Sequence, residues 1–259
     1  MVLVQKALPR PLYLPLLRPR ETSYTHSLTL DSTLYWLHRM MNPNAQSRGA
    51  NDLGCFSDIP LRASLFEAHA HAACRVAMAQ KRKHPLRFLD VVCGGGMRLL
   101  QASDFFDHVE GFDFDENYVR AGQSAMAQMR AVRCNIYHDN ALTFEGYPQY
   151  EIIYFYQPMA DNDGLEKLEE QIVKFARPGT ILIAPYAKFL QRAKGFNCGR
   201  VEEAVFVTST TQSEADTLRR EAERIGPQVM HPDKSHRNLG VDWLVNLAAA
   251  CSSNGYLVP

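Results

Sequence analysis

The sequence predicts an α/β protein with an open, doubly wound and mainly parallel sheet, preceded by an N-terminal helical extension. Two observations predict this fold. From Arg87 onward, short apolar stretches alternate with longer helix-like ones, and strands separated by helices of that length pair in parallel through right-handed crossovers. The first apolar stretch also ends in an acid and a cluster of glycines, which is typical of a buried strand that turns tightly into a helix.

The residues before this alternation predict an arm, two helices and a long loop. The first twenty residues combine basic side chains with prolines and contain no acid, so we expect an extended arm rather than an amphipathic transit peptide. Helices are expected at 28–41 and 61–81, and the Asn-, Gly- and Pro-rich stretch 42–60 between them is expected to be a loop. Residues 1–84 are therefore predicted to form an N-terminal arm, helices and a lid.

Residues 85–259 are predicted to form a Rossmann-like domain with an irregular C-terminal part. Beyond Pro185 the alternation weakens, and the sequence indicates a strand, a charged helix and an apolar helix. The expected strands are 88–92, 108–112, 134–137, 152–156, 180–184 and 204–209, and the expected helices are 97–105, 116–129, 164–176, 213–225 and 241–251.

Composition limits the classes of function. Basic and acidic residues both number 28, which argues against a surface devoted to nucleic acid, although the basic run 81–83 does not exclude a local RNA contact. The six cysteines are scattered without a CxxC pair, so we expect reduced thiols, a cytoplasmic location and no zinc site. No apolar run is long enough to span a membrane.

One helical face has the spacing of metal ligands. His71 follows Glu67 by four residues, and Cys74 follows His71 by three. This spacing places all three side chains on one side of a helix. A fourth ligand is missing from this segment, so we expect no metal and interpret these residues as a partly exposed helix face with a buried Cys74.

The glycine cluster indicates a nucleoside-containing ligand. It follows the first strand and opens a helix, where backbone amides can approach a ligand closely. Asp113 ends the second apolar stretch, where an acid can accept hydrogen bonds from a ribose diol. An NAD fingerprint would need a third glycine at the position of Leu99, and Gly96-Met97-Arg98 does not supply the Lys-Ser/Thr of a phosphate loop.

This arrangement resembles the S-adenosylmethionine-dependent methyltransferases with the class I Rossmann-like fold. Their acid-x-G-x-G-x-G loop matches Asp90 to Gly96, except that Val92 stands in place of the first glycine. A β-branched residue disfavours the positive φ that glycine allows there. Either the loop opens differently at Val92, or cofactor binding is weakened. The resemblance covers about 87–186.

The resemblance implies a role for each matching residue. Asp90 would lie behind the methionine end of the cofactor, and the backbone of Cys93, Gly94 and Gly96 would run along it. Asp113 would bind the ribose hydroxyls. The other implied positions are Phe114 against the adenine, Asp139, Asn140 and Ala141 near the adenine amino group, and Tyr156 at the fourth strand end where methyl transfer occurs.

The resemblance implies S-adenosyl-L-methionine as the cofactor and methyl transfer as the reaction. The residues after the fourth strand, 156–161, are not the Asn/Asp-Pro-Pro-Tyr box of amino-methylating nucleic-acid enzymes, so a small-molecule or protein acceptor is favoured and nucleic acid is not excluded. Catalytic residues and oligomeric state remain open. Val92 and the lack of an identified catalytic base keep one alternative open, a non-catalytic sensor or partner subunit that binds S-adenosylmethionine or S-adenosylhomocysteine. A third hypothesis is an enzyme that uses the same fold and cofactor for other chemistry, such as aminopropyl transfer, which would need a more acidic pocket. Residues 46–54 have the composition of a lid that closes over the cofactor.

Overall fold

The computed structural model describes residues 35, 38–39, 41–43, 45–59, 61–82, 85–128, 131, 133–160 and 163–225. The expected basic arm, most of the helix expected at 28–41 and the apolar helix expected at 241–251 lie outside the described residues. The predicted N-terminal helical extension therefore stays a prediction.

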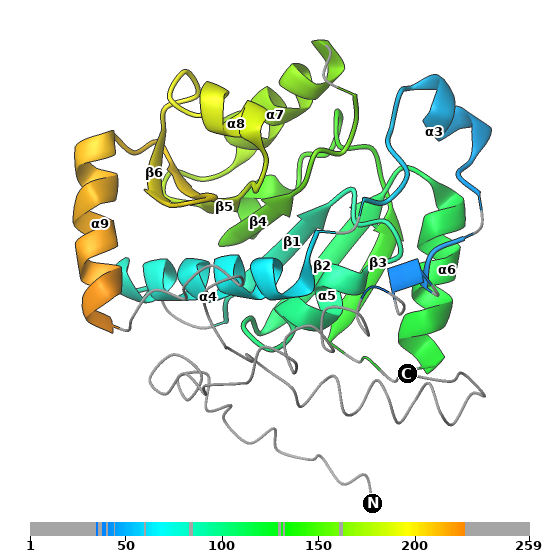
Figure 1. Ribbon diagram of the computed structural model, residues 1–259, viewed down its shortest axis with the longest axis horizontal. Coiled ribbons are helices and arrows are strands. Elements are labelled where there is room, and N and C mark those ends of the chain that lie inside the picture. The colour runs from blue at the N-terminus through cyan, green and yellow to red at the C-terminus, as the bar shows by residue number, and fades with distance from the viewer. Residues whose placement is uncertain are drawn as a thin grey trace, which may run out of the picture.

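A seven-stranded sheet forms the centre of the molecule (Figure 1). Its strand order is β3-β2-β1-β4-β5-β7-β6. Strands β3, β2, β1, β4 and β5 pair in parallel, whereas β7 is antiparallel to both of its neighbours. The predicted doubly wound, mainly parallel fold is thus confirmed. The strands are β1 (Arg87–Val91), β2 (His108–Asp113), β3 (Cys134–His138), β4 (Ile152–Phe155), β5 (Ile181–Ile183), β6 (Cys198–Glu202) and β7 (Val205–Thr208).

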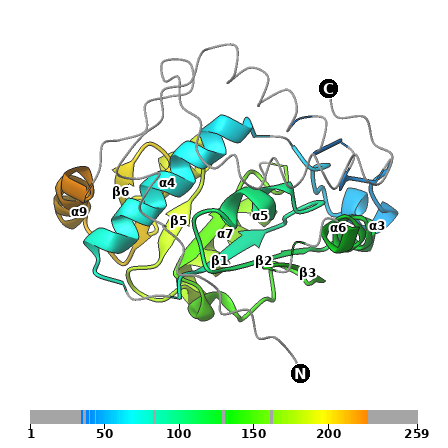
Figure 2. The ribbon, with the colours of Figure 1, turned by 90° about the horizontal axis from the view of Figure 1, so that it is seen from below.

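Helices cover both faces of this sheet, and each face has its own hydrophobic core. Because side chains alternate along a strand, Phe88 and Ile152 point into one core, and Leu89 and Ile153 point into the other. The first core is covered by α4 (Ala63–Ala79), α5 (Met97–Ala102), α6 (Glu116–Gln128) and α9 (Gln212–Ile225), and Figure 2 shows α4 lying across this face. The second is covered by η1 (Tyr147–Gln149), α7 (Asp163–Phe175) and α8 (Ala187–Arg192).

Two elements after β5 were not expected from the sequence. Helix α8 is short, and β6 contains a glycine and an arginine that mask its strand character. Gly199 is required there by packing, because a Cβ at this position would lie 2.8 Å from the Cβ of Ala215 in α9. The close approach of α9 to β6 thus explains a residue that weakens the strand signal.

Helix α4 is more deeply buried than expected. Glu67, His71 and Cys74 are all at most 2% exposed, so the interpretation of this face as partly exposed is wrong. Arg75 lies one helical turn after His71 and is fully buried, and it forms an ion pair with Glu202 of β6 at 2.6 Å. The hairpin of β6 and β7, which the sequence did not show clearly, pairs with β5 and supplies this charge to α4.

Two observations concern the described part of the chain. None of its helices is long and apolar enough to cross a membrane. Five of the six cysteines fall within the described residues, and all five are free thiols.

Candidate functional site

A cavity lies at the carboxyl ends of β1, β2 and β4. In an open α/β sheet, ligands bind outside these strand ends where the strand order reverses, and here the order reverses between β1 and β4. Three parts of the chain form most of its wall: Asp90 and Val92–Gly94 at the end of β1, Tyr154 and Tyr156–Pro158 at the end of β4, and residues 55–59 before α4. The other lining residues are His38, Gln46, Met97, Arg98, Asp113 and Tyr118.

The loop after β1 has the backbone conformation of a glycine loop despite Val92. Val92 has φ +62°, in the left-handed region, and Gly94 and Gly96 have φ +54° and +81°. The Cys93 amide donates to the carbonyl of Phe112 at 2.9 Å, which fixes the loop to β2. The loop therefore does not open differently at Val92, and the β-branched side chain is held there under strain.

This strain predicts an unusual tolerance to substitution. Val92→Gly is expected to change the free energy of unfolding by no more than about 1 kcal/mol, because relief of backbone strain offsets the loss of a half-buried side chain and the added freedom of the unfolded chain. Val91→Gly, in the neighbouring buried strand position, should cost about 3 kcal/mol or more. Urea denaturation of both variants measures this contrast, and equal losses would show that Val92 is not strained.

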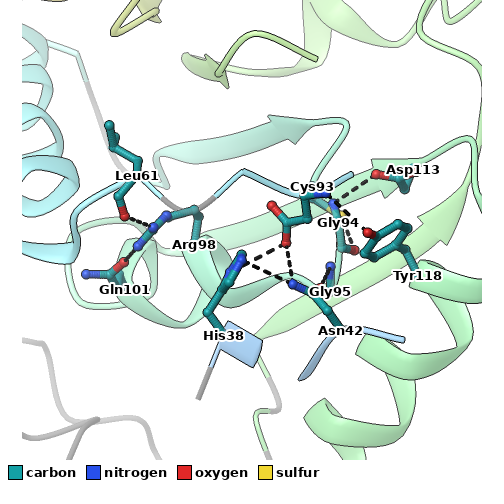
Figure 3. Close-up of polar contacts among 11 residues, drawn as sticks. His38, Asn42, Leu61, Cys93, Gly94, Gly95, Arg98, Gln101, Asp113 and Tyr118 are labelled. Atoms are coloured by element: carbon teal, nitrogen blue, oxygen red, sulfur yellow. Dashed lines mark hydrogen bonds and ion pairs between the residues drawn. The ribbon is translucent and has the colours of Figure 1, made fainter. Parts of the chain in front are cut away.

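Asp113 joins the end of β2 to the glycine loop. Its Oδ2 accepts a hydrogen bond from the Gly94 amide at 2.9 Å (Figure 3). Its Oδ1 accepts one from the Asp115 amide at 2.8 Å. Burial, with a smaller contribution from the carboxylate of Asp58, raises the pKa of Asp113 to about 7, against the lowering effect of these two amides. Each oxygen keeps a free lone pair, so the side chain can also accept two hydroxyl hydrogen bonds.

Asp90 is a buried acid at the base of the cavity. It is 2% exposed, and its Oδ2 has no hydrogen-bond partner. Burial raises the pKa of Asp90 well above its ordinary value, Asp58 raises it further and Arg98 lowers it. A buried acceptor without a partner is costly, so this oxygen is suited to bind a donor group of a ligand.

Arg98, on the first turn of α5, supplies the positive charge in this wall. Its guanidinium donates to the carbonyl of Leu61 and to the side chain of Gln101 (Figure 3), and it lies 5.6 Å from the centre of the Phe66 ring. These contacts hold Arg98 against the chain before α4. The charge of Arg98 still lowers the pKa of Asp90. The described hydrogen bonds of Arg98, however, go to groups other than the acids of the cavity.

The segment before α4 covers the glycine loop through Asn42. The side chain of Asn42 accepts a hydrogen bond from the Gly95 amide at 2.8 Å and donates one to Asp58 at 2.9 Å. His38 Nδ1 lies 3.5 Å from the same Asp58 oxygen, and the Asp58 amide donates to the Tyr118 hydroxyl at 3.2 Å. Figure 3 shows His38 and Asn42 beside the glycine loop.

A second set of contacts ties this segment to the chain after β4. Cys55 and Met159 form an antiparallel bridge, the Phe56 amide donates to the carbonyl of Pro158 at 3.3 Å, and the Ala160 amide donates to that of Gly54 at 3.0 Å. The cavity is thus closed on one side by residues far from the sheet in sequence. The sequence indicated a lid in this region but did not identify Asn42, Asp58 or Tyr118, because no spacing pattern relates them to the glycine loop.

The structure brings five of the ten sequence-predicted residues to the cavity, namely Asp90, Cys93, Gly94, Asp113 and Tyr156. Gly96 begins α5 and instead faces Ile136, whose Cδ1 would lie 2.4 Å from an added Cβ. The remaining four, Phe114, Asp139, Asn140 and Ala141, lie beside Asp113 at the ends of β2 and β3 but do not line the cavity.

Two of these outlying positions have local structural partners. The Phe114 carbonyl is hydrogen-bonded to His138 Nε2 at 2.9 Å, and the Asp139 amide donates to the Asp113 carbonyl at 3.2 Å. These bonds hold the ends of β2 and β3 together. They do not test the adenine contacts predicted for these residues, which stay a prediction.

The glycine loop after β1 and the acid at the tip of β2 meet at one end of the doubly wound sheet. The strand order β3-β2-β1-β4-β5-β7-β6, with β7 antiparallel, is the doubly wound fold expected from the resemblance to class I S-adenosylmethionine-dependent methyltransferases. No protein-family model and no curated protein matches the sequence.

Among solved structures, three similar ones are methyltransferases. An S-adenosylmethionine-bound amino pentose methyltransferase from Micromonospora echinaspora is 19% identical over 56% of this chain, with a TM-score of 0.38. Magnesium protoporphyrin IX methyltransferase from Synechocystis PCC 6803, with bound S-adenosylhomocysteine, is 15% identical over 66%, with a TM-score of 0.39. A methyltransferase from Aquifex aeolicus is 16% identical over 61%, with a TM-score of 0.43. The matches span 58%, 76% and 96% of those chains, respectively. No activity follows from similarity at this level.

Proposed function

We propose that this protein is an S-adenosylmethionine-dependent methyltransferase that acts on a small molecule or a protein side chain. The observation that supports this most strongly is the pairing of Asp113 with the glycine loop at the edge of one cavity. A nucleoside laid across this edge would find ribose acceptors on Asp113, which the Gly94 amide holds in place. Asp90, with an unpartnered buried oxygen, fits a ligand that also carries donor groups.

The same cavity reaches the strand end where a methyl acceptor would meet the cofactor. Methyl transfer from a sulfonium is an in-line displacement, so the protein mainly has to hold the nucleophile against the methyl group. Tyr156, Gln157 and Pro158 line the cavity beyond β4, and we propose that they form the acceptor side. Tyr154 has a different role, because it is buried and packs edge-on against Phe66 with ring centres 5.0 Å apart.

We also propose that residues 46–54 act as a lid. They form the short helix α3 (Arg48–Asp52), which Ser47 caps, and the Ser47 amide donates to the carboxylate of Asp115 beside the cavity. The side chain of Gln46 bonds to the carbonyls of Cys55 and Phe56. The lid thus contacts both the end of β2 and the segment that covers the glycine loop.

Isothermal titration with S-adenosylmethionine and S-adenosylhomocysteine tests the cofactor proposal. We expect saturable binding of both at one site, and an absence of heat with either ligand would contradict it. Incubation with labelled S-adenosylmethionine and fractionated cell extract then tests transfer. Binding without any labelled product would identify a sensor or partner subunit instead of an enzyme.

A further inference from the structure

Asp58 lies directly over the glycine loop. A Cβ built on Gly94 would be 2.3 Å from Asp58 Oδ2 and 2.4 Å from its carboxyl carbon. Only a glycine at this position leaves room for the carboxylate. Asp58 therefore approaches the part of the loop where the backbone would meet the cofactor, and it lines the same cavity.

The charges of the described lining residues are unbalanced. Asp58, Asp90 and Asp113 contribute three carboxyl groups, against the single guanidinium of Arg98. Burial raises the pKa of Asp90 and Asp113, so the site disfavours their ionisation while it is empty. His38 does not offset this excess at neutral pH, because burial lowers its pKa below the ordinary value, although Asp58 acts in the opposite direction. A ligand that carries positive charge would balance these acids.

The three acids divide between the two ends of the proposed cofactor. Asp113 is positioned for the ribose diol. Asp58 lies against Gly94 and is close enough to Asp90 for its charge to raise the pKa of Asp90. Asp90 Oδ2 is buried and has no partner, so a donor group between the two acids would satisfy it. The nucleoside part of S-adenosylmethionine is neutral, its sulfonium is positively charged, and its amino-acid part carries an ammonium group and a carboxylate. Of these groups only the ammonium is both positively charged and a hydrogen-bond donor.

We infer that Asp58 and Asp90 together bind the α-ammonium group of the cofactor, with Asp58 contributed by the N-terminal segment. This inference rests on the proposed function and adds a residue outside the glycine loop. Asn42 and His38 hold the Asp58 side chain at 2.9 and 3.5 Å. Binding of the amino-acid end of the cofactor therefore depends on this segment being in place over the site.

Asp58→Asn tests this assignment with two ligands. S-adenosylhomocysteine has the ammonium group, and its des-amino analogue lacks only that group. The wild-type protein is expected to bind S-adenosylhomocysteine at least about tenfold more tightly than the analogue, because a hydrogen bond between charged groups is lost. Asp58→Asn is expected to bind S-adenosylhomocysteine about tenfold more weakly and the analogue with little change.

Two controls separate this inference from the proposed function and from misfolding. Glu221→Gln removes an exposed carboxylate of α9, away from the cavity, whose side chain is 47% exposed, and should leave both affinities unchanged. The wild-type comparison needs no variant, so it is valid even if Asp58→Asn does not fold. Equal wild-type affinities for the two ligands, or unchanged discrimination in folded Asp58→Asn, would overturn the inference. Failure of the wild type to bind either ligand would instead overturn the proposed function.

Discussion

Asp113→Ala is expected to weaken S-adenosylhomocysteine binding by about a hundredfold or more. The variant removes the acceptors for two ribose hydroxyls, each worth about 1.5–3 kcal/mol when the partner is charged. It also releases the Gly94 and Asp115 amides, which the carboxylate now holds in place. Isothermal titration measures the loss, and wild-type affinity in this variant would show that the ribose assignment is wrong.

The raised pKa of Asp113 makes this prediction depend on pH. A pKa of about 7 means that the carboxyl must lose a proton on binding below neutral pH. Wild-type affinity is therefore expected to rise about tenfold from pH 6 to pH 8. In Asp113→Asn the affinity should no longer rise between pH 6 and pH 8. If it still rises, a group other than Asp113 causes the pH dependence.

The raised pKa of Asp113 makes cofactor affinity rise with pH, but it makes the stability of the protein without cofactor fall with pH. Because folding raises the pKa of Asp113 from 3.8 to about 7, its contribution to stability is fully present below about pH 4. That contribution is lost as the pH rises through 7. Thermal unfolding at pH 5 and pH 8, compared between wild type and Asp113→Asn, separates this contribution from those of the other acids.

Gly94→Ala is expected to weaken cofactor binding and to loosen the N-terminal segment. Its Cβ would overlap the Asp58 carboxyl group, and φ +54° is strained for alanine. Asp58 must move, and the cavity wall moves with it. We expect at least a tenfold loss of S-adenosylhomocysteine affinity. Trypsin should also cleave faster after Arg48, whose side chain is 95% exposed at the start of α3.

Gly49→Ala is the matched control, because nothing lies within 4 Å of a Cβ built at Gly49. It should leave affinity unchanged and stabilise α3 slightly. Trypsin cleavage at Arg48 also tests the lid itself. In the wild type, S-adenosylhomocysteine should slow this cleavage, and in Gly94→Ala it should not. Equal wild-type cleavage with and without the ligand would contradict the lid proposal.

The central strands could be predicted because their sequence signals are local. The expected strand at 88–92 is β1, and that at 108–112 is β2, each within a residue of its observed bounds. Buried parallel strands are continuous apolar runs, and the helices between them have clear periodicity. Strand β6 was missed because Gly199 packs against α9 and the Arg200 amide donates to the side chain of Gln212 at the start of α9, contacts that no local pattern shows.

The sequence by itself determined the doubly wound fold and, through Asp90, the glycines and Asp113, one edge of the cavity. These features follow from periodicity and from acids at strand ends, both of which are read within a few residues. Only the tertiary structure decided that Val92 keeps a glycine-like φ, that Arg98 bonds to the chain before α4, and that Asp58 closes the site. Each of these features depends on contacts between segments far apart in the chain. Packing and hydrogen bonds hold the strained backbone of Val92 and the charged side chains of Arg98 and Asp58 in place, and the spacing of residues in the sequence does not reveal those contacts.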